Sequence, residues 1–266
     1  METPRGPALI LGGAPSLPTD LERLPEALRS TATRVSANEH GARLGPVQWV
    51  VCGDRNHQVT REPMLERVRQ FHDGPVVTQH FVEGTVRLHN WHQWYIPASS
   101  GHMAILWAWL LGHSPIIVCG IEHYTGGTYF HDPKFPSSGF TKRKDYHLDW
   151  FKKLYFQIQP CTIRAASGPL GKVVGYFDPK ETLSPSYRRH HRRDAYWLQT
   201  IHPYQFTKTN PLTRVGPTQF SEGDIAHLTD AEAKDGLKFG WLRRLKNATS
   251  QEDPDQSGLR QFVGAG

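Results

Sequence analysis

The first segment of this chain that could bind a phosphate is a turn of small residues behind an apolar run. The apolar residues Ala8–Leu11 are followed by Gly12, Gly13, Ala14, Pro15, Ser16 and Leu17. Small residues let the backbone approach a ligand closely, and the N–H groups of such a turn, together with the dipole of a following helix, attract an anion. A glycine turn is also often only a turn, so both roles stay open at this segment alone.

A pair of serines before an apolar stretch of helical length is the second candidate anion site. Ser99, Ser100 and Gly101 open this stretch, which continues to Leu111. Hydroxyl groups and unpaired N–H groups at the start of a helix can bind an anion or can simply cap the helix. Capping is the commoner of the two roles at a single site.

A third group of polar residues follows the apolar run Pro115–Gly120. It contains Glu122 and Tyr124, with Tyr129 further along the chain. Ligands in open α/β sheets bind at the carboxyl ends of parallel strands. This segment is therefore expected at a ligand site if the run before it is a strand of such a sheet.

The elements that would position these residues alternate between apolar strands and helix-compatible stretches up to about Leu170. The expected strands are Ala8–Leu11, Thr33–Ser36, Val47–Cys52, Val76–Thr78, Pro115–Gly120 and Cys161–Arg164. The expected helices are Asp20–Leu28, Pro63–Phe71, Gly101–Leu111 and Asp149–Gln157. This alternation predicts an α/β fold with a Rossmann-like, mostly parallel sheet and helices on both faces. Asn38 and Asp54 come shortly after the second and third strands, where a ligand would meet them.

Four parts are expected along the chain. They are a Rossmann-like domain over residues 1–170, a basic and aromatic extension over 171–210, a small module over 211–246 and a disordered tail over 247–266. Within the extension a helix is expected over Ala195–Ile201. Within the module we expect a strand over Ile225–Leu228 and a helix that the capping box Thr229–Glu232 opens. The module weakly resembles short segments of bacteriophage structural proteins.

Length and composition exclude several classes of protein. The chain has 266 residues, with 31 Lys and Arg against 25 Asp and Glu and a formal charge of +6. Charged residues make up only 21% and hydrophobic residues 38%, which excludes a polyelectrolyte disordered chain. The longest apolar run would cover only about half of the roughly 20 residues that cross a bilayer. We expect a cytoplasmic protein, in the host cytoplasm if a bacteriophage encodes it. We also expect its cysteines to be reduced. Whether it forms a homo-oligomer is left open.

The densest basic patch contains Arg188, Arg189, Arg192 and Arg193, next to aromatic residues. Arginines interleaved with aromatic residues can bind a polyanion such as single-stranded nucleic acid. A solvated helix start or a subunit contact is the commoner explanation. No pair of histidines has a carboxylate partner at a recognisable spacing, so no metal site is expected.

Taken together, the three motifs resemble those of the bacterial sialyltransferases of glycosyltransferase family 42. The shared order is a Gly-x-x-Pro-Ser-Leu turn, an asparagine after the second strand, a Ser-Gly pair that opens a buried helix and a Gly-Ile-Asp/Glu-x-Tyr segment. The resemblance runs from about Leu9 to Leu170, and its most specific part is Ser99–Tyr129. A related domain of flagellin-glycosylation accessory proteins and of an archaeal-type pterin pyrophosphokinase is similar too.

The resemblance implies a domain that binds a nucleotide sugar, with a CMP-sugar favoured as the donor and with no separate cofactor. Ser16 and Asn38 would hold the nucleotide, and Ser100 would contact the phosphate or ribose. The full donor site that the motifs predict consists of Gly12, Gly13, Pro15, Ser16, Asn38, Asp54, Ser99, Ser100, Gly101, Gly120 and Glu122.

The resemblance also implies a metal-independent mechanism. Tyr124 and Tyr129 would donate hydrogen bonds to the leaving phosphate in place of a metal ion. His147 would be the general base that deprotonates the acceptor hydroxyl, a task that suits the ordinary pKa of histidine. The acceptor could be a glycan, a protein or DNA.

The chain departs from the family pattern at two positions. Gly13 stands where those enzymes have asparagine, which removes a side-chain contact to the donor. Glu122 replaces aspartate and could reach a ribose hydroxyl or serve as a structural carboxylate. Three alternatives to a glycosyltransferase remain. The Gly13 departure leaves open a noncatalytic interaction protein of the same fold, and the basic patch and phage-like module leave open a phage DNA-binding or DNA-modifying protein. The third is a pyrophosphokinase that uses a magnesium-bound triphosphate.

Overall fold

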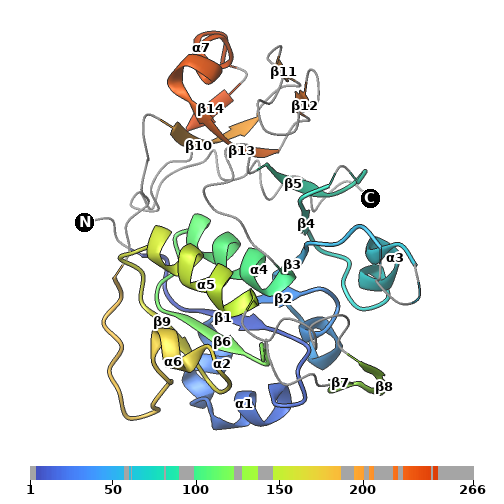
Figure 1. The fold of residues 1–266 in the computed structure, drawn as a ribbon, viewed down its shortest axis with the longest axis vertical. Coiled ribbons are helices and arrows are strands. Elements are labelled where there is room, and N and C mark those ends of the chain that lie inside the picture. Colours follow the sequence, from blue (N-terminus) through green and yellow to red (C-terminus); the bar gives the residue numbers. More distant parts are fainter. Residues whose placement is uncertain are drawn as a thin grey trace.

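The structure is a computed structural model that describes most of the chain. The described residues are 4–56, 60, 62–80, 82–89, 99–122, 128–136, 146–186, 195–200, 204–206, 218–220, 224–240 and 242–244. A largely parallel sheet lies at the centre, with helices on both faces (Figure 1). The expected α/β fold is confirmed.

The central sheet has the strand order β14-β10-β13-β5-β4-β3-β2-β1-β6-β9. Its parallel part contains β1 (Ala8–Leu11), β2 (Thr33–Ala37), β3 (Trp49–Cys52), β4 (Val76–Thr78), β5 (Val86–His89), β6 (Ile116–Cys119) and β9 (Ile163–Ala165). In β1, Ile10 lies opposite Val35 on one side and Val118 on the other. The central strands β1 and β6 are apolar and buried at every position because helices cover both faces of the sheet.

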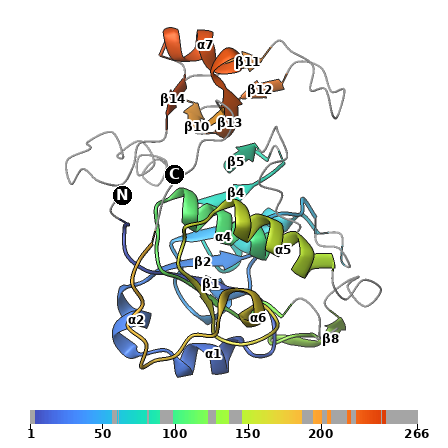
Figure 2. The same cartoon turned by 60° about the vertical axis from the view of Figure 1, so that its left-hand side comes forward.

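Helices form one layer on each face. They are α1 (Leu17–Arg23), α2 (Glu26–Thr31), the 3-10 helix η1 (Gly41–Leu44), α3 (Met64–Arg69), α4 (Ser100–Leu110), α5 (Tyr146–Gln157) and α6 (Gly171–Val174). Helices α4 and α5 lie on one face of the sheet and α1 and α2 on the other (Figures 1 and 2). Alternate residues of β1 divide accordingly, since Ala8 and Ile10 pack in the core that contains α4, and Leu9 and Leu11 pack in the core that contains Leu17.

Helix α4 is buried at every position, as its apolar sequence predicts. Ser99 caps the helix, because its side chain accepts a hydrogen bond from the backbone N–H of His102 at 3.2 Å. Trp107 lies edge-on to Trp49 of β3, with the ring centroids 5.1 Å apart. The buried helix thus holds Ser99 and Ser100, at its amino end, near the carboxyl end of β3.

Two expected helices differ in the structure. The helix expected over Asp20–Leu28 is two helices, because Leu24, the residue before Pro25, is extended, as residues before proline prefer. The helix expected over Ala195–Ile201 is wrong. This segment is strand β10 (Ala195–Thr200), which pairs with two neighbouring strands and contains Tyr, Trp and Thr, residue types that favour strands.

The C-terminal strands continue the central sheet. They are β13 (Ile225–Thr229) and β14 (Leu242–Arg244), which flank β10 in antiparallel pairing, and α7 (Asp230–Lys238) connects them. The strand expected over Ile225–Leu228 and the helix after Thr229 are confirmed. Strand β13 pairs with β5, although residues 211–246 were expected to be a module of their own. The division into four parts stays a prediction.

Two short hairpins lie outside the central sheet. One pairs β11 (Tyr204–Phe206) with β12 (Thr218–Phe220), and the other pairs β7 (Thr128–Tyr129) with β8 (Asp132–Pro136). The second hairpin contains Tyr129, one of the expected catalytic residues. No helix in the described part of the chain is long and apolar enough to span a bilayer.

Candidate functional site

The strand order reverses between β1 and β6, and this is where ligands bind in open α/β sheets. The turns that follow these two strands touch each other. The N–H of Gly12 donates to the carbonyl of Cys119 at 2.8 Å, and the N–H of Ala14 donates to the carbonyl of Gly120 at 2.9 Å. A Cβ atom at Gly12 would lie 2.1 Å from the Gly120 carbonyl oxygen, so only glycine allows this approach.

A buried carboxylate holds the two turns in place. Oδ2 of Asp20 accepts hydrogen bonds from the N–H of Gly120 at 2.8 Å, from the Ser167 hydroxyl at 2.9 Å and from the Ser16 hydroxyl at 3.3 Å. Burial raises the pKa of Asp20 above its ordinary value, and the three hydrogen bonds oppose the shift. Ser16, expected to bind the nucleotide, therefore has a protein partner for its hydroxyl proton. Asp20 was not among the expected site residues.

Gly13 is covered by aromatic side chains. The carbonyl of Gly13 accepts a hydrogen bond from the N–H of Phe130, in the turn between β7 and β8, at 2.9 Å. A Cβ atom at Gly13 would lie 2.7 Å from the His40 ring and 2.8 Å from the Tyr129 ring. Any side chain at residue 13 would therefore clash, because the two rings occupy its space.

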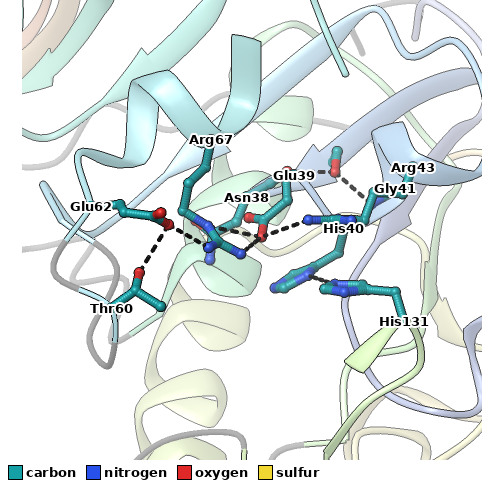
Figure 3. Close-up of polar contacts among 10 residues, drawn as sticks. Asn38, Glu39, His40, Gly41, Arg43, Thr60, Glu62, Arg67 and His131 are labelled. Carbon is teal, nitrogen blue, oxygen red and sulfur yellow. Dashed lines mark hydrogen bonds and ion pairs between the residues drawn. The ribbon is translucent and has the colours of Figure 1, made fainter. Parts of the chain in front are cut away.

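Three rings pack together beside Gly13. The ring centroid of His40 lies 4.4 Å from that of Tyr129 and 5.1 Å from that of His131, and the Tyr129 and His131 rings are stacked at 5.6 Å. Nδ1 of His40 lies 2.9 Å from Nε2 of His131, so one ring donates a hydrogen bond to the other (Figure 3). Burial lowers the pKa of His40 to about 4 and lowers the pKa of His131. Burial raises the pKa of Tyr129, so its phenol stays protonated at neutral pH.

Glu39, next to these rings, is a buried carboxylate. Its Oε1 accepts hydrogen bonds from Nη2 and Nε of Arg67 at 2.7 and 3.3 Å, and Nη2 of Arg43 lies 3.8 Å away (Figure 3). Burial alone would raise the pKa of Glu39, but the neighbouring His40 and the hydrogen-bonded Arg67 outweigh it and hold the pKa at about 2. Oε2 is buried and has no hydrogen-bond partner among the described residues.

Asn38 follows β2 in a left-handed backbone conformation, with φ at 55°. Asparagine tolerates this conformation better than most residues. The N–H of Asn38 donates to the carbonyl of Val51 at 2.9 Å, and its carbonyl accepts from the Ser36 hydroxyl at 2.7 Å. The side-chain Oδ1 is buried and has no hydrogen-bond partner within the described ranges. The backbone of Asn38 is thus fixed while its amide oxygen still has acceptor capacity.

The serines at the start of α4 both contact protein groups. Ser99 caps the helix, and the Ser100 hydroxyl oxygen accepts a hydrogen bond from the N–H of Gly53, after β3, at 2.9 Å. Gly101 packs on Ile121, because a Cβ atom at Gly101 would lie 2.9 Å from that side chain. Ser100 therefore joins α4 to the end of β3, next to Asp54, and its hydroxyl proton can still be donated.

The remaining residues that the sequence singled out lie away from the three rings or outside the described part of the chain. His147 lies in the first turn of α5, buried at 3% exposure, and its ring centroid is 5.9 Å from that of His102 on α4. Burial lowers the pKa of His147. Glu122 lies beside Gly168, where a Cβ atom would be 3.1 Å from the Glu122 Cγ. Tyr124 and the four arginines of the basic patch lie outside the described residues.

The structure thus brings part of the expected site together. Gly12 meets Gly120, Gly13 meets Tyr129, and Ser100 meets the end of β3. The contacts described for His147 are with α4 and not with the three rings. Sequence reasoning missed the cluster around Glu39, and the one signal for it is the adjacency of Glu39 and His40 after an expected strand.

Comparison with known proteins gives one distant likeness. No protein family model and no curated protein matches the chain. Among solved structures, the Campylobacter jejuni sialyltransferase CstII, in complex with the substrate analogue cytidine-5'-monophosphate, matches with 13% sequence identity and a TM-score of 0.32. The match covers 72% of this chain and 93% of that one. The α/β fold of this chain is established by its own strand order.

Proposed function

We propose that this chain is a glycosyltransferase that binds a nucleotide sugar, with a CMP-sugar favoured, at the carboxyl ends of β1 and β6. The observation that carries the proposal is the buried Oδ1 of Asn38, which has no partner in the described part of the chain. An amide oxygen of this kind can accept a hydrogen bond from a base or ribose, and leaving it unpaired costs about 1–3 kcal/mol. Asn38 follows the carboxyl end of β2, the strand next to β1 in the sheet.

Tyr129 is proposed to stabilise the leaving phosphate. Its raised pKa keeps the phenol O–H intact as a donor, and its ring lies against the glycine turn that follows β1. A donor placed in a partly buried site stabilises a developing negative charge without a metal ion. Tyr124 is the second donor that the sequence pattern suggests.

His147 is proposed as the base for the acceptor hydroxyl. Support for this role comes from its position in the sequence pattern and from its lowered pKa, which keeps the imidazole neutral and able to accept a proton at neutral pH. Because the ring is buried, His147→Ala is to be measured for stability as well as for turnover and nucleotide binding. A variant that keeps its stability and its affinity for CMP but loses turnover supports the assignment.

The release of CMP from a CMP-sugar tests the proposed reaction. The assay compares the wild-type chain with Tyr129→Phe, which keeps the ring packed against His40 and His131 and removes only the hydroxyl. Tyr176→Phe is the matched control, because Tyr176 is 51% exposed. We expect Tyr129→Phe to lower turnover by about 10²–10³-fold, the usual effect of losing one such donor. Equal turnover in the two variants would remove Tyr129 from the mechanism.

A further inference from the structure

Three potential metal ligands from two distant segments meet beside Gly13. Glu39 and His40 lie in the turn after β2, and His131 lies in the turn between β7 and β8, 91 residues from His40 (Figure 3). The nitrogen and carboxylate oxygen atoms that these residues offer as ligands all lie within 4.8 Å of one another. Two imidazoles and one carboxylate are a donor set that Zn²⁺ and similar transition metals accept.

The spacing of the two imidazole nitrogens suits a shared ion. Nδ1 of His40 and Nε2 of His131 are 2.9 Å apart. Two nitrogens bound to one Zn²⁺ at about 2.0–2.1 Å are about 3.4 Å apart in tetrahedral geometry, so the rings need to separate by only about 0.5 Å. Between two neutral rings one nitrogen carries a hydrogen. Its transfer to the outer nitrogen of the same ring leaves two lone pairs that face each other.

The carboxylate of Glu39 is already oriented by its neighbours. Arg67 binds Oε1 and also donates to Glu62 at 2.8 Å, so its charge is shared between two carboxylates. Glu39 as a whole is only 1% exposed. Its Oε2 is buried, and no described residue forms a hydrogen bond with this oxygen. A buried carboxylate oxygen without a partner is costly. Hydrogen bonds that fix a carboxylate from behind are typical of the partners that orient metal ligands.

The charged side chains around the cluster are balanced, so their net charge does not prevent a cation from binding together with a further anionic or water ligand. Glu39 and Glu62 balance Arg67 and Arg43, and the Arg43 guanidinium lies over the Phe71 ring, 4.1 Å from its centroid. The four side chains together are therefore neutral. With three protein ligands, a fourth position on the ion stays open to water, hydroxide or another anion.

From this arrangement we infer that Glu39, His40 and His131 bind one divalent transition-metal ion of the Zn²⁺ type. The ion fastens the β7–β8 hairpin to the turn after β2 and so holds the Tyr129 ring against Gly13. This role is structural and stands independently of the proposed glycosyl transfer, since metal binding is measured without a nucleotide. It also differs from the expectation that the chain has no metal site.

Titration of the metal-free full chain with Co²⁺, followed by visible absorption and calorimetry, tests this inference. Wild type is expected to bind one equivalent and to show the d–d bands of a low-coordinate Co²⁺ site. His131→Ala is expected to bind Co²⁺ at least 10-fold more weakly, since even residues behind the ligands are worth about 10–100-fold. The control is His80→Ala, which removes an exposed histidine outside the cluster and should leave the affinity unchanged.

A direct sign of coordination comes from His131→Cys. A thiolate bound to Co²⁺ adds a charge-transfer band in the near ultraviolet, which a cysteine that merely lies nearby does not. Glu39→Gln should also weaken binding, and if this variant does not fold, the two His131 variants decide the question. No stoichiometric Co²⁺ binding by wild type, or equal affinity in wild type and His131→Ala, would overturn the inference and leave a plain hydrogen bond between the two histidines.

Discussion

The backbone N–H of Gly120 donates to the buried carboxylate of Asp20 at 2.8 Å and so joins the turn after β6 to helix α1. The same carboxylate oxygen accepts from Ser167, after β9, at 2.9 Å. One side chain from the first helix thus fixes the ends of two neighbouring strands. The position of the turn after β6 relative to α1 and β9 depends on this contact.

Asp20→Ala is expected to destabilise the fold. The substitution leaves the buried N–H of Gly120 and the hydroxyl of Ser167 without their acceptor, and each unsatisfied buried group costs about 1–3 kcal/mol. We expect a loss of about 2–4 kcal/mol in the free energy of unfolding, measured by urea denaturation. The matched control is Asp73→Ala, because Asp73 is exposed and should change stability little. A loss of similar size in both variants would contradict the role given to Asp20.

Gly13→Ala is expected to displace the β7–β8 hairpin. The added Cβ would lie 2.7 Å from the His40 ring and 2.8 Å from the Tyr129 ring, which is closer than van der Waals contact allows. Overpacking of this kind costs about 1–3 kcal/mol. A lower melting temperature together with faster proteolysis within residues 128–136 would show the displacement. An unchanged melting temperature would mean that the rings do not cover Gly13 in solution.

Acid should destabilise the protein through His113. This ring is 6% exposed, lies 3.2 Å from the Gly6 carbonyl through Nδ1, and burial lowers its pKa from 6.5 to about 4. Because the unfolded chain takes up the proton first, stability falls as the pH falls from 6.5 to about 4, by on the order of 3 kcal/mol. Other buried histidines shift in the same direction, so the comparison must isolate His113. Urea denaturation at pH 7.5 and 4.5 should show a smaller loss for His113→Gln than for wild type, and equal losses would argue against this group.

The link between β5 and the C-terminal strands should depend on one ion pair. Arg87 of β5 lies 2.7 Å from Asp224, just before β13, and both side chains are largely buried. Removing one partner of a buried ion pair costs about 3–5 kcal/mol. Asp224→Ala should therefore release the C-terminal strands, and limited proteolysis should cut within residues 224–244 before the rest of the chain. Cleavage at the wild-type rate would show that strand pairing alone holds them.

Strong local patterns made much of the parallel sheet predictable. The runs before Gly12 and Gly120 are continuously apolar, and both form strands of the buried, doubly covered type. Strand β10 was mistaken for a helix because its state is set by pairing with β13 and β14, which lie far away in the sequence. No spacing rule links His40 with His131, because a hairpin brings them together across 91 residues. The packing of the His40 and Tyr129 rings on Gly13 has no local signal in the sequence either, because both rings come from other segments of the chain.

The most direct test of the account is calorimetric titration of CMP, with and without Mg²⁺, into wild type, Asn38→Gly and Asn56→Ala. Glycine accepts the left-handed backbone of residue 38, so the first variant removes only the amide, while Asn56 is exposed and serves as the matched control. We expect metal-independent binding by wild type and by Asn56→Ala, and binding by Asn38→Gly that is at least about 10-fold weaker, as the loss of one buried hydrogen bond predicts. The absence of CMP binding to wild type, or equal affinity in all three proteins, would contradict a nucleotide site at Asn38.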